Sequence, residues 1–304
     1  MTCPTCGSNE STIYLTKPAQ RAIYTIVKCT QCGLLYLDPM PTDDERTAYY
    51  NSPAYFHGDE AGYTSDYTKQ RASIERESLR RLGRIEALLP KPLGSARRIL
   101  DLGCAAGYFL GVAQRRGWDI AGVELARDMA AHASASLGIT VGTGFDPDKF
   151  DAASFDAITL WEVIEHLPQA CDTLRAARHL IKPGGVVAIS TPNTGHWQAQ
   201  THPEWWREFK PPAHLVFFTD ATLGETLQRS GFTRVTFEHT RPLTISPRLL
   251  ARLHGIRDVF GDGANPRTPF WPLTSSVYRA VNMLGAFRHR GEDIYIGLEA
   301  YAQP

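Results

Sequence analysis

The sequence lacks three features that would each indicate a particular class of protein. No run of 18 apolar residues occurs among its 304 residues and no apolar segment follows the N-terminal MTCPTC, so we expect neither a spanning helix nor a signal peptide and place the chain in the cytoplasm. Lysine plus arginine equals aspartate plus glutamate at 32 each, so no overall charge attracts nucleic acid or an anionic membrane. Glycine and proline are not in excess and 43% of the residues are hydrophobic, which excludes a disordered or fibrous chain.

Cysteine is also scarce, but four of the six cysteines form two pairs of identical spacing. The pairs are Cys3 with Cys6 and Cys29 with Cys32. They are 22 residues apart, and a glycine follows each. Two such turns aim four thiolates at one point, so we predict a structural zinc ribbon with a β-hairpin (12–15 and 22–28) between the turns. Two disulfides or two redox-active dithiols are the alternatives.

Beyond residue 65 the chain alternates between strand-like and helix-like segments. Apolar residues at helical spacing predict an amphipathic helix within 66–89. Strand-like runs follow at 97–102, 119–125, 140–144, 155–161 and 185–191. This alternation predicts an α/β fold with a doubly wound parallel sheet.

These sequence patterns divide the chain into five parts. The expected parts are a zinc ribbon (1–40), a connector (41–65), a core (66–240), a basic helical insert (241–291) and a closing strand of the core (292–304). The connector is rich in proline, acidic residues and tyrosine, which predicts irregular structure, although its tyrosines could line a site.

The first strand-to-helix turn, Asp101 to Gly107, is where an open α/β sheet approaches its ligand. A dinucleotide fingerprint starting at Gly103 needs glycine at positions that are occupied here by Ala105 and Tyr108, and no Gly-Lys-Ser/Thr follows, so neither NAD nor a P-loop nucleotide is expected. An acidic residue, Glu124, ends the second strand 23 residues after Asp101. A carboxylate at that place accepts hydrogen bonds from both hydroxyls of a ribose.

Four ordered motifs resemble those of class I S-adenosylmethionine-dependent methyltransferases. They are ILDLGCAAGYF (99–109), GVELA (122–126), SFDAITLWEVIEHL (154–167) and LIKPGGVVAISTPN (180–193). The resemblance covers about 66–240 and the closing strand, and it implies a seven-stranded Rossmann-like sheet whose last strand, within 292–301, is antiparallel.

The resemblance also implies which residues bind S-adenosylmethionine. Those bordering the methionine half would be Asp101, Gly103, Ala105 and Gly107. Glu124 would bind the ribose, and Phe145 and Trp161 would flank the adenine or ribose. For Phe145, simple core packing is an equal alternative.

Two carboxylates and an imidazole follow the fourth strand, at Glu162, Glu165 and His166. The stretch resembles that of ubiquinone-pathway O-methyltransferases, in which a Glu-x-x-Glu-His cluster holds a divalent cation near a catechol-type acceptor. If helical, Glu162 and Glu165 would share a face, and the three residues could bind Mg²⁺. Support of the loop is the alternative, and His166 could equally be a catalytic base.

An aromatic-rich segment, 196–219, follows the fifth strand and has the composition of an acceptor lid. Its His214 resembles the histidine that precedes the next helix in sugar and quinone methyltransferases, and we predict that it is catalytic. A structural histidine is the alternative. Further on, 241–290 carries eight arginines against two acidic residues, which suits an anionic acceptor such as a sugar, lipid or carrier-linked molecule, or else forms a solvated basic face.

The leading hypothesis is a methyltransferase that acts on a small molecule or a glycan or natural-product precursor by in-line methyl transfer. An RNA methyltransferase with the ribbon as its RNA module is one alternative, but residues 1–60 hold four basic side chains against seven acidic ones. A noncatalytic module that binds the cofactor to stabilise a partner protein is the other.

Overall fold

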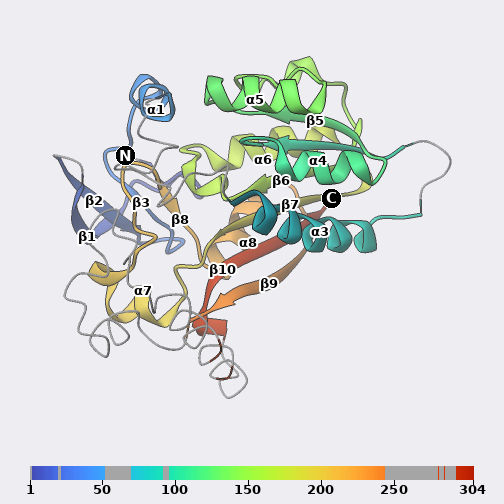
Figure 1. Cartoon of the computed structure of the whole chain (residues 1–304). Coiled ribbons are helices and arrows are strands. Elements are labelled where there is room, and N and C mark those ends of the chain that lie inside the picture. Colours follow the sequence, from blue (N-terminus) through green and yellow to red (C-terminus); the bar gives the residue numbers. More distant parts are fainter. Residues whose placement is uncertain are drawn as a thin grey trace.

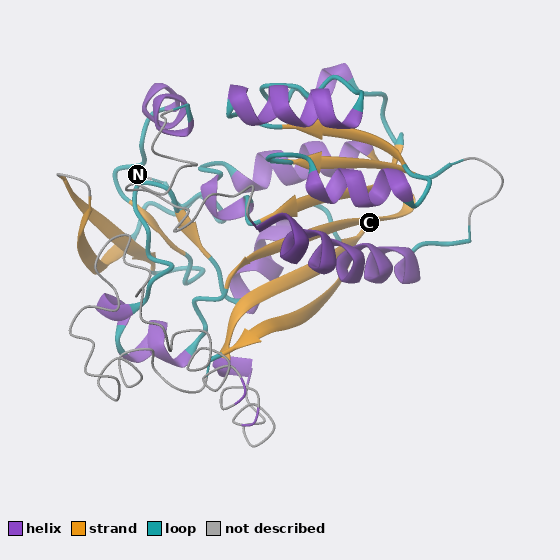
Figure 2. Ribbon diagram, in the orientation of Figure 1, coloured by secondary structure: helices purple, strands orange, loops and turns teal. Residues whose placement is uncertain are grey.

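The structure of the protein, a computed structural model, has a large α/β sheet and a small N-terminal sheet (Figures 1 and 2). It describes residues 2–19, 22–51, 70–91, 96–243 and 292–304, with residues 280 and 284. The expected connector from residue 52 to 65 and most of the expected basic insert lie outside these residues.

The large sheet has the strand order β5-β4-β6-β7-β10-β9 within the described residues. Its strands are β4 (Arg98–Leu102), β5 (Asp119–Val123), β6 (Phe155–Trp161), β7 (Ile181–Pro192), β9 (Arg234–Pro242) and β10 (Tyr295–Gln303). The pairs among β5, β4, β6 and β7 are parallel, whereas β10 is antiparallel to both β7 and β9. The expected parallel sheet with an antiparallel closing strand is confirmed.

The strand expected at 140–144 is wrong in extent. Only a parallel bridge between Val123 and Gly142 remains at that edge of the sheet. Gly142 and Gly144 supply no side chains to pack against a neighbour, and glycine weakens a strand. The sheet therefore has six strands and one bridge in the described chain, instead of seven strands.

Helices cover both faces of the large sheet (Figure 2). Those in the chain's described part are α1 (Asp43–Tyr50), α3 (Arg71–Leu88), α4 (Tyr108–Arg115), α5 (Arg127–Leu137), α6 (Ala170–Leu180), α7 (Trp197–Thr201) and α8 (Asp220–Arg229). Apolar side chains of α3, α4 and α5 pack on one face with Ile99, Ala157 and Val186 of the sheet. Those of α6 and α8 pack on the other face with Leu100 and Ile158. Burying such apolar stripes is the main driving force for this fold.

The small sheet joins the N-terminal segment to a distant part of the chain. It has the order β1-β2-β3-β8, with strands β1 (Ser11–Ala19), β2 (Ala22–Cys29), β3 (Leu35–Leu37) and β8 (Val216–Phe217). β1 and β2 form the hairpin that was expected between the cysteine pairs. β3 pairs with β8, and the Leu37 amide donates to the Leu215 carbonyl at 2.9 Å. The N-terminal segment thus forms hydrogen bonds with the residues directly after His214.

Candidate functional site

The turn after β4 is wound tightly by residues in the left-handed conformation. Gly103 and Gly107 have φ of 75° and 79°, and Ala105 has φ of 46°. A Cβ atom on Gly103 would lie 2.5 Å from a methyl carbon of Val163, so the turn has no room for a side chain there. Gly107 is the N-cap of α4, which places the backbone amides of the turn at a helix N-terminus.

Asp101 is buried at the start of this turn, with 2% of its surface exposed. Thr159 of β6 donates its hydroxyl to Asp101 Oδ1 at 2.6 Å. Burial raises the pKa of Asp101 to about 7, and the charge of Glu124 adds to the effect. A cation placed beside Asp101 would lower this pKa again.

Glu124 follows β5 and connects two loops. Its Oε2 accepts the Ala105 amide and its Oε1 accepts the Ala126 amide, both at 2.8 Å. Burial raises the pKa of Glu124, while these amide donors oppose the shift. Each carboxylate oxygen has a second lone pair, so this anchoring still leaves acceptors for ribose hydroxyls.

The two expected aromatic neighbours of the cofactor have different environments. Trp161, at the end of β6, makes an edge contact with Phe109, and their ring centroids are 5.5 Å apart. The Arg81 guanidinium of α3 lies 4.3 Å from the centroid of the Trp161 ring. The Trp161 indole N–H is buried and meets no hydrogen-bond acceptor in the described part of the protein. Phe145 is half-buried against the apolar core, which fits the packing alternative as well as a cofactor contact.

The condition under which Glu162 and Glu165 would share a helix face is not met. Only Ile164–His166 form a short 3-10 helix, and Glu162 precedes it with a φ of 56°. The Glu162 carboxylate turns to Arg241 Nη2, 3.3 Å away, and accepts the Ser190 hydroxyl at 3.0 Å. The magnesium site expected from Glu162, Glu165 and His166 is therefore not assembled as predicted.

Instead, Glu165 and His166 meet His214, and their potential ligand atoms all lie within 4.8 Å of one another. His166 Nδ1 lies 2.7 Å from the Ala213 carbonyl, and His214 Nδ1 lies 2.7 Å from the Glu208 carbonyl. A carbonyl oxygen can only accept, so Nδ1 carries the proton in both rings and Nε2 is left as an acceptor. Two imidazoles and one carboxylate suit zinc or a similar transition metal better than magnesium.

Burial keeps both histidines neutral. It lowers the pKa of His166 to about 3, with His214 as the next cause, and that of His214 to about 4, with Lys210 as the next cause. Burial, and then the charge of Glu162, raise the pKa of Glu165 well above its usual range. Neither oxygen of Glu165 meets a hydrogen-bond donor of suitable geometry among the described residues.

Charged residues of the expected lid and a tyrosine of the connector lie around these histidines. His166 and His214 are in edge contact at 4.9 Å, and the Tyr50 hydroxyl lies 2.7 Å from His166 Nδ1. Glu208 is paired with Lys210 at 2.8 Å, and its pKa is lowered to about 2 by Lys210 and His214 against the effect of burial. A tyrosine of the connector therefore does line this site.

The four clustered cysteines come together at the base of the small sheet. Their ligand atoms lie within 4.8 Å of one another, and Sγ atoms of Cys3 and Cys32, and of Cys6 and Cys29, are 3.5 Å apart. In a tetrahedral site with Zn–S bonds of about 2.3 Å, neighbouring sulfurs are about 3.8 Å apart. All six cysteines are free thiols, so the donor set fits zinc and not the disulfide alternative.

Three side chains that contact these sites were not foreseen. Thr159 was seen only as part of a strand, Arg81 only as part of the polar face of a helix, and Arg241 only as the first arginine of a basic segment. Their roles depend on partners from other strands: Asp101 for Thr159, Trp161 for Arg81 and Glu162 for Arg241. No local sequence signal identifies such partners.

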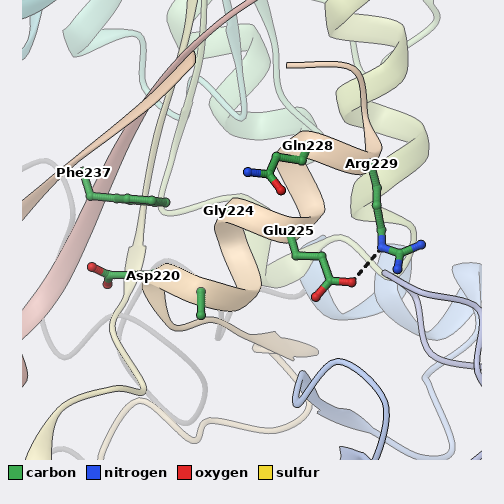
Figure 3. Close-up of a pocket in the computed structure, with 7 residues that line it drawn as sticks. Asp220, Gly224, Glu225, Gln228, Arg229 and Phe237 are labelled. Atoms are coloured by element: carbon green, nitrogen blue, oxygen red, sulfur yellow. Dashed lines mark hydrogen bonds and ion pairs between the residues drawn. The ribbon is translucent and has the colours of Figure 1, made fainter. Parts of the chain in front are cut away.

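An open hollow of about 750 Å³ lies elsewhere, between α8 and β9 (Figure 3). Gly224 and Phe237 line it, and Glu225 is paired with Arg229 at its wall. None of the residues that were expected to bind cofactor, metal or acceptor lines this hollow. We assign it no part in the site.

Comparison with known proteins agrees with the geometry of the turn and sheet. A family described as a methyltransferase domain matches residues 69–236. A ubiquinone biosynthesis O-methyltransferase from Chromobacterium violaceum is 30% identical over 206 residues, which is 64% of this chain and 79% of that protein. One from Paracidovorax citrulli is 34% identical over 125 residues, 37% of this chain and 50% of that protein, so the chain spans about half of that relative.

Solved structures share the fold. A S-adenosylmethionine-dependent methyltransferase from Archaeoglobus fulgidus superposes with a TM-score of 0.51 at 18% identity, covering 77% of this chain and 94% of that one. Another from Leishmania major has a TM-score of 0.51 at 12% identity, covering 86% of this chain and 82% of that one.

Among the described residues, every helix is too short or too polar to span a membrane. The chain belongs to the class I S-adenosylmethionine-dependent methyltransferase family.

Proposed function

We propose that the protein transfers a methyl group from S-adenosylmethionine to a hydroxyl oxygen of a small-molecule acceptor. The observation that carries this proposal is a pair of neutral histidines with Nε2 free of a proton. One of them, His166, lies shortly after β6, the strand that pairs with β4. The 30% identity to a ubiquinone biosynthesis O-methyltransferase supports oxygen as the methylated atom.

On the cofactor side, Asp101 and Glu124 are proposed to bind the ammonium of the methionine half and the ribose hydroxyls. Gly103, Ala105 and Gly107 bring the backbone close to the cofactor, and Trp161 donates its unpartnered indole N–H to it. Phe145 is proposed to border the adenine or ribose. When bound, S-adenosylmethionine supplies a methyl group that is already activated, so the protein has to orient it and exclude water.

On the acceptor side, His214 is proposed as the general base. Its Nδ1–H is held by the Glu208 carbonyl, which aims Nε2 toward the cluster with Glu165 and His166. Nε2 accepts the proton of the acceptor hydroxyl as the oxygen attacks the methyl carbon in line. His166 positions this pair through its contacts with His214, Tyr50 and the Ala213 carbonyl.

Two metal sites accompany the proposal. Cys3, Cys6, Cys29 and Cys32 would hold a structural zinc ion with no open position for chemistry. As an alternative to general-base catalysis, Glu165, His166 and His214 would hold a transition metal ion, which would supply Lewis-acid activation of the acceptor hydroxyl. In this scheme residues 1–40 form the ribbon, 41–65 the connector, 66–240 with 292–304 the catalytic core, and 241–291 a basic insert.

The test measures S-adenosylhomocysteine release with a panel of catechol and phenol acceptors. His214→Ala should lower kcat by about 100-fold or more, the size of a general-base contribution, and leave S-adenosylhomocysteine binding unchanged. His179→Ala, at an exposed position at the end of α6, is the matched control and should keep full activity. Full activity of His214→Ala would contradict the assignment of His214. Metal analysis of Cys29→Ser, which lacks the ribbon zinc, separates general-base from metal-assisted catalysis.

A further inference from the structure

Two charged residues, one directly after β6 and one near the end of β9, have the same unusual backbone conformation. Glu162 follows β6 with a φ of 56°, and Arg241 lies near the end of β9 with a φ of 60°. Among the described residues, Ala105 and Ala153 are the other two non-glycine residues with positive φ. Side chains destabilise this conformation, and such residues cluster at functional sites where the surroundings hold them.

The side chains of these two residues meet. Arg241 Nη2 lies 3.3 Å from Glu162 Oε1. Glu162 is fixed by Ser190 of β7, whose hydroxyl donates to the same oxygen at 3.0 Å and whose carbonyl accepts the Glu162 amide at 2.9 Å. Ser190 therefore fixes the Glu162 carboxylate, and this carboxylate in turn binds the Arg241 guanidinium. The Arg241 side chain crosses the ends of β7 and β10 to reach it.

Gly297 of β10 leaves the space for this crossing. It pairs with Pro192 of β7 and Thr240 of β9. A Cβ atom at Gly297 would lie 2.8 Å from Arg241 Nη2 and 2.9 Å from its Nε, and it would also contact the Thr240 hydroxyl. Real Cβ atoms do not approach that closely, so the Arg241 side chain passes over a strand position that only glycine leaves open.

The guanidinium has donors beyond those needed for Glu162. A guanidinium carries five N–H groups in a planar fork that matches a carboxylate. Among the described residues, Glu162 engages one nitrogen of Arg241, and 53% of the Arg241 side chain is exposed. The charges of Glu162 and Glu208 both raise the pKa of Arg241, and the Glu208 carbonyl also holds His214. The fork thus lies beside the acceptor side of the proposed active site.

We propose that Arg241 is the anion-recognition residue of the acceptor pocket and selects acceptors that carry a carboxylate. This inference rests on the proposed function. The acceptor's carboxylate takes the guanidinium fork as a bidentate pair, and Glu162 holds the arginine in position before the acceptor arrives. A purely structural ion pair that pins β9 to β6 is the competing explanation, and it predicts no selectivity for charge.

The test uses two catechol probes that differ in one group, 3,4-dihydroxybenzoate and 3,4-dihydroxybenzamide. Calorimetric titration of the protein saturated with S-adenosylhomocysteine should give at least about tenfold tighter binding of the carboxylate, the strength of one charge-assisted hydrogen bond. Arg241→Gln should remove that preference. Glu162→Gln, which removes the group that positions the guanidinium, should reduce it.

Gly297→Ala tests the same geometry without changing a charge, and should also reduce the preference. Arg229→Gln is the matched control, because that arginine pairs with Glu225 on the surface of α8. Thermal melting reports whether each variant is folded. If Arg241→Gln does not fold, Arg241→Lys replaces it. Equal binding of both probes, no binding of either, or a preference that survives Arg241→Gln would overturn the inference. If the wild type did not bind S-adenosylhomocysteine, that result would instead contradict the proposed function.

Discussion

Ala105 donates its backbone amide to Glu124 Oε2 at 2.8 Å, which ties the turn after β4 to the residue that follows β5. The other oxygen of Glu124 accepts the Ala126 amide at the start of α5. One buried carboxylate therefore fixes both loops that border the proposed cofactor site. Such support keeps a binding site in its productive geometry before the ligand arrives.

Gly103→Ala should weaken the cofactor site and the fold together. The added Cβ would lie 2.5 Å from a methyl carbon of Val163, and the alanine would have to adopt a φ of 75°. We therefore expect a loss of about 1–3 kcal/mol in the free energy of unfolding. Chemical denaturation measures this loss. Adding Val163→Ala should recover the part due to the clash and leave the part due to φ; no recovery would contradict the contact.

Cofactor affinity should rise with pH around neutrality. Burial raises the pKa of Asp101 to about 7 in the folded protein, whereas an unfolded chain releases this proton near pH 4. Between pH 4 and pH 7 the folded state therefore binds more protons, and the free energy of unfolding falls as the pH rises. Only the ionised Asp101 attracts an ammonium, so S-adenosylhomocysteine should bind about tenfold more tightly at pH 8 than at pH 6. Calorimetry checks this dependence.

Asp101→Asn is the companion variant for that measurement. It should bind S-adenosylhomocysteine more weakly and with affinity that hardly changes between pH 6 and pH 8. A wild type that is equally insensitive to pH would show that Asp101 does not ionise in contact with the cofactor.

Cys29→Ser should release zinc and loosen the acceptor side while sparing the cofactor side. β3 pairs with β8 next to His214, Tyr14 donates its hydroxyl to the Ala199 carbonyl at 2.8 Å, and Lys17 donates to the Trp206 carbonyl at 3.3 Å. Losing a structural zinc removes about 10 kcal/mol or more of folding free energy from a small ribbon. We expect changed tryptophan fluorescence and S-adenosylhomocysteine affinity within about twofold of the wild type.

Zinc content is measured on the same samples. Thr30→Ala, at an exposed position of the second cysteine turn, should retain the metal and the wild-type fluorescence. Full zinc content and unchanged melting of Cys29→Ser would refute a four-cysteine site.

The sequence predicts those elements whose signal is local. β6 occupies the predicted range 155–161 because its apolar run is buried along the strand, and the cysteine turns converge because two residues separate each pair. Gly142 shows the limit of such patterns. Apolar and small residues suggested a strand there, but an edge position without side-chain packing leaves a single bridge.

The candidate site depended more on contacts between distant residues. The sequence identified Asp101 and Glu124 through their spacing, and it placed His166 and His214 among the candidates. It did not foresee that His214 replaces Glu162 beside Glu165, because the backbone of Glu162 turns into a left-handed conformation and Arg241, 79 positions later, takes its carboxylate. Such long-range choices depend on the complete fold.

The most direct test of the central claim is calorimetric titration of the metal-quantified protein with S-adenosylhomocysteine, for the wild type and Glu124→Ala, with NADH as the control ligand. We predict micromolar binding by the wild type, at least about tenfold weaker binding by Glu124→Ala and no binding of NADH. Failure of the folded wild type to bind S-adenosylhomocysteine, or equal affinity in the two proteins, would contradict the cofactor site described for this chain.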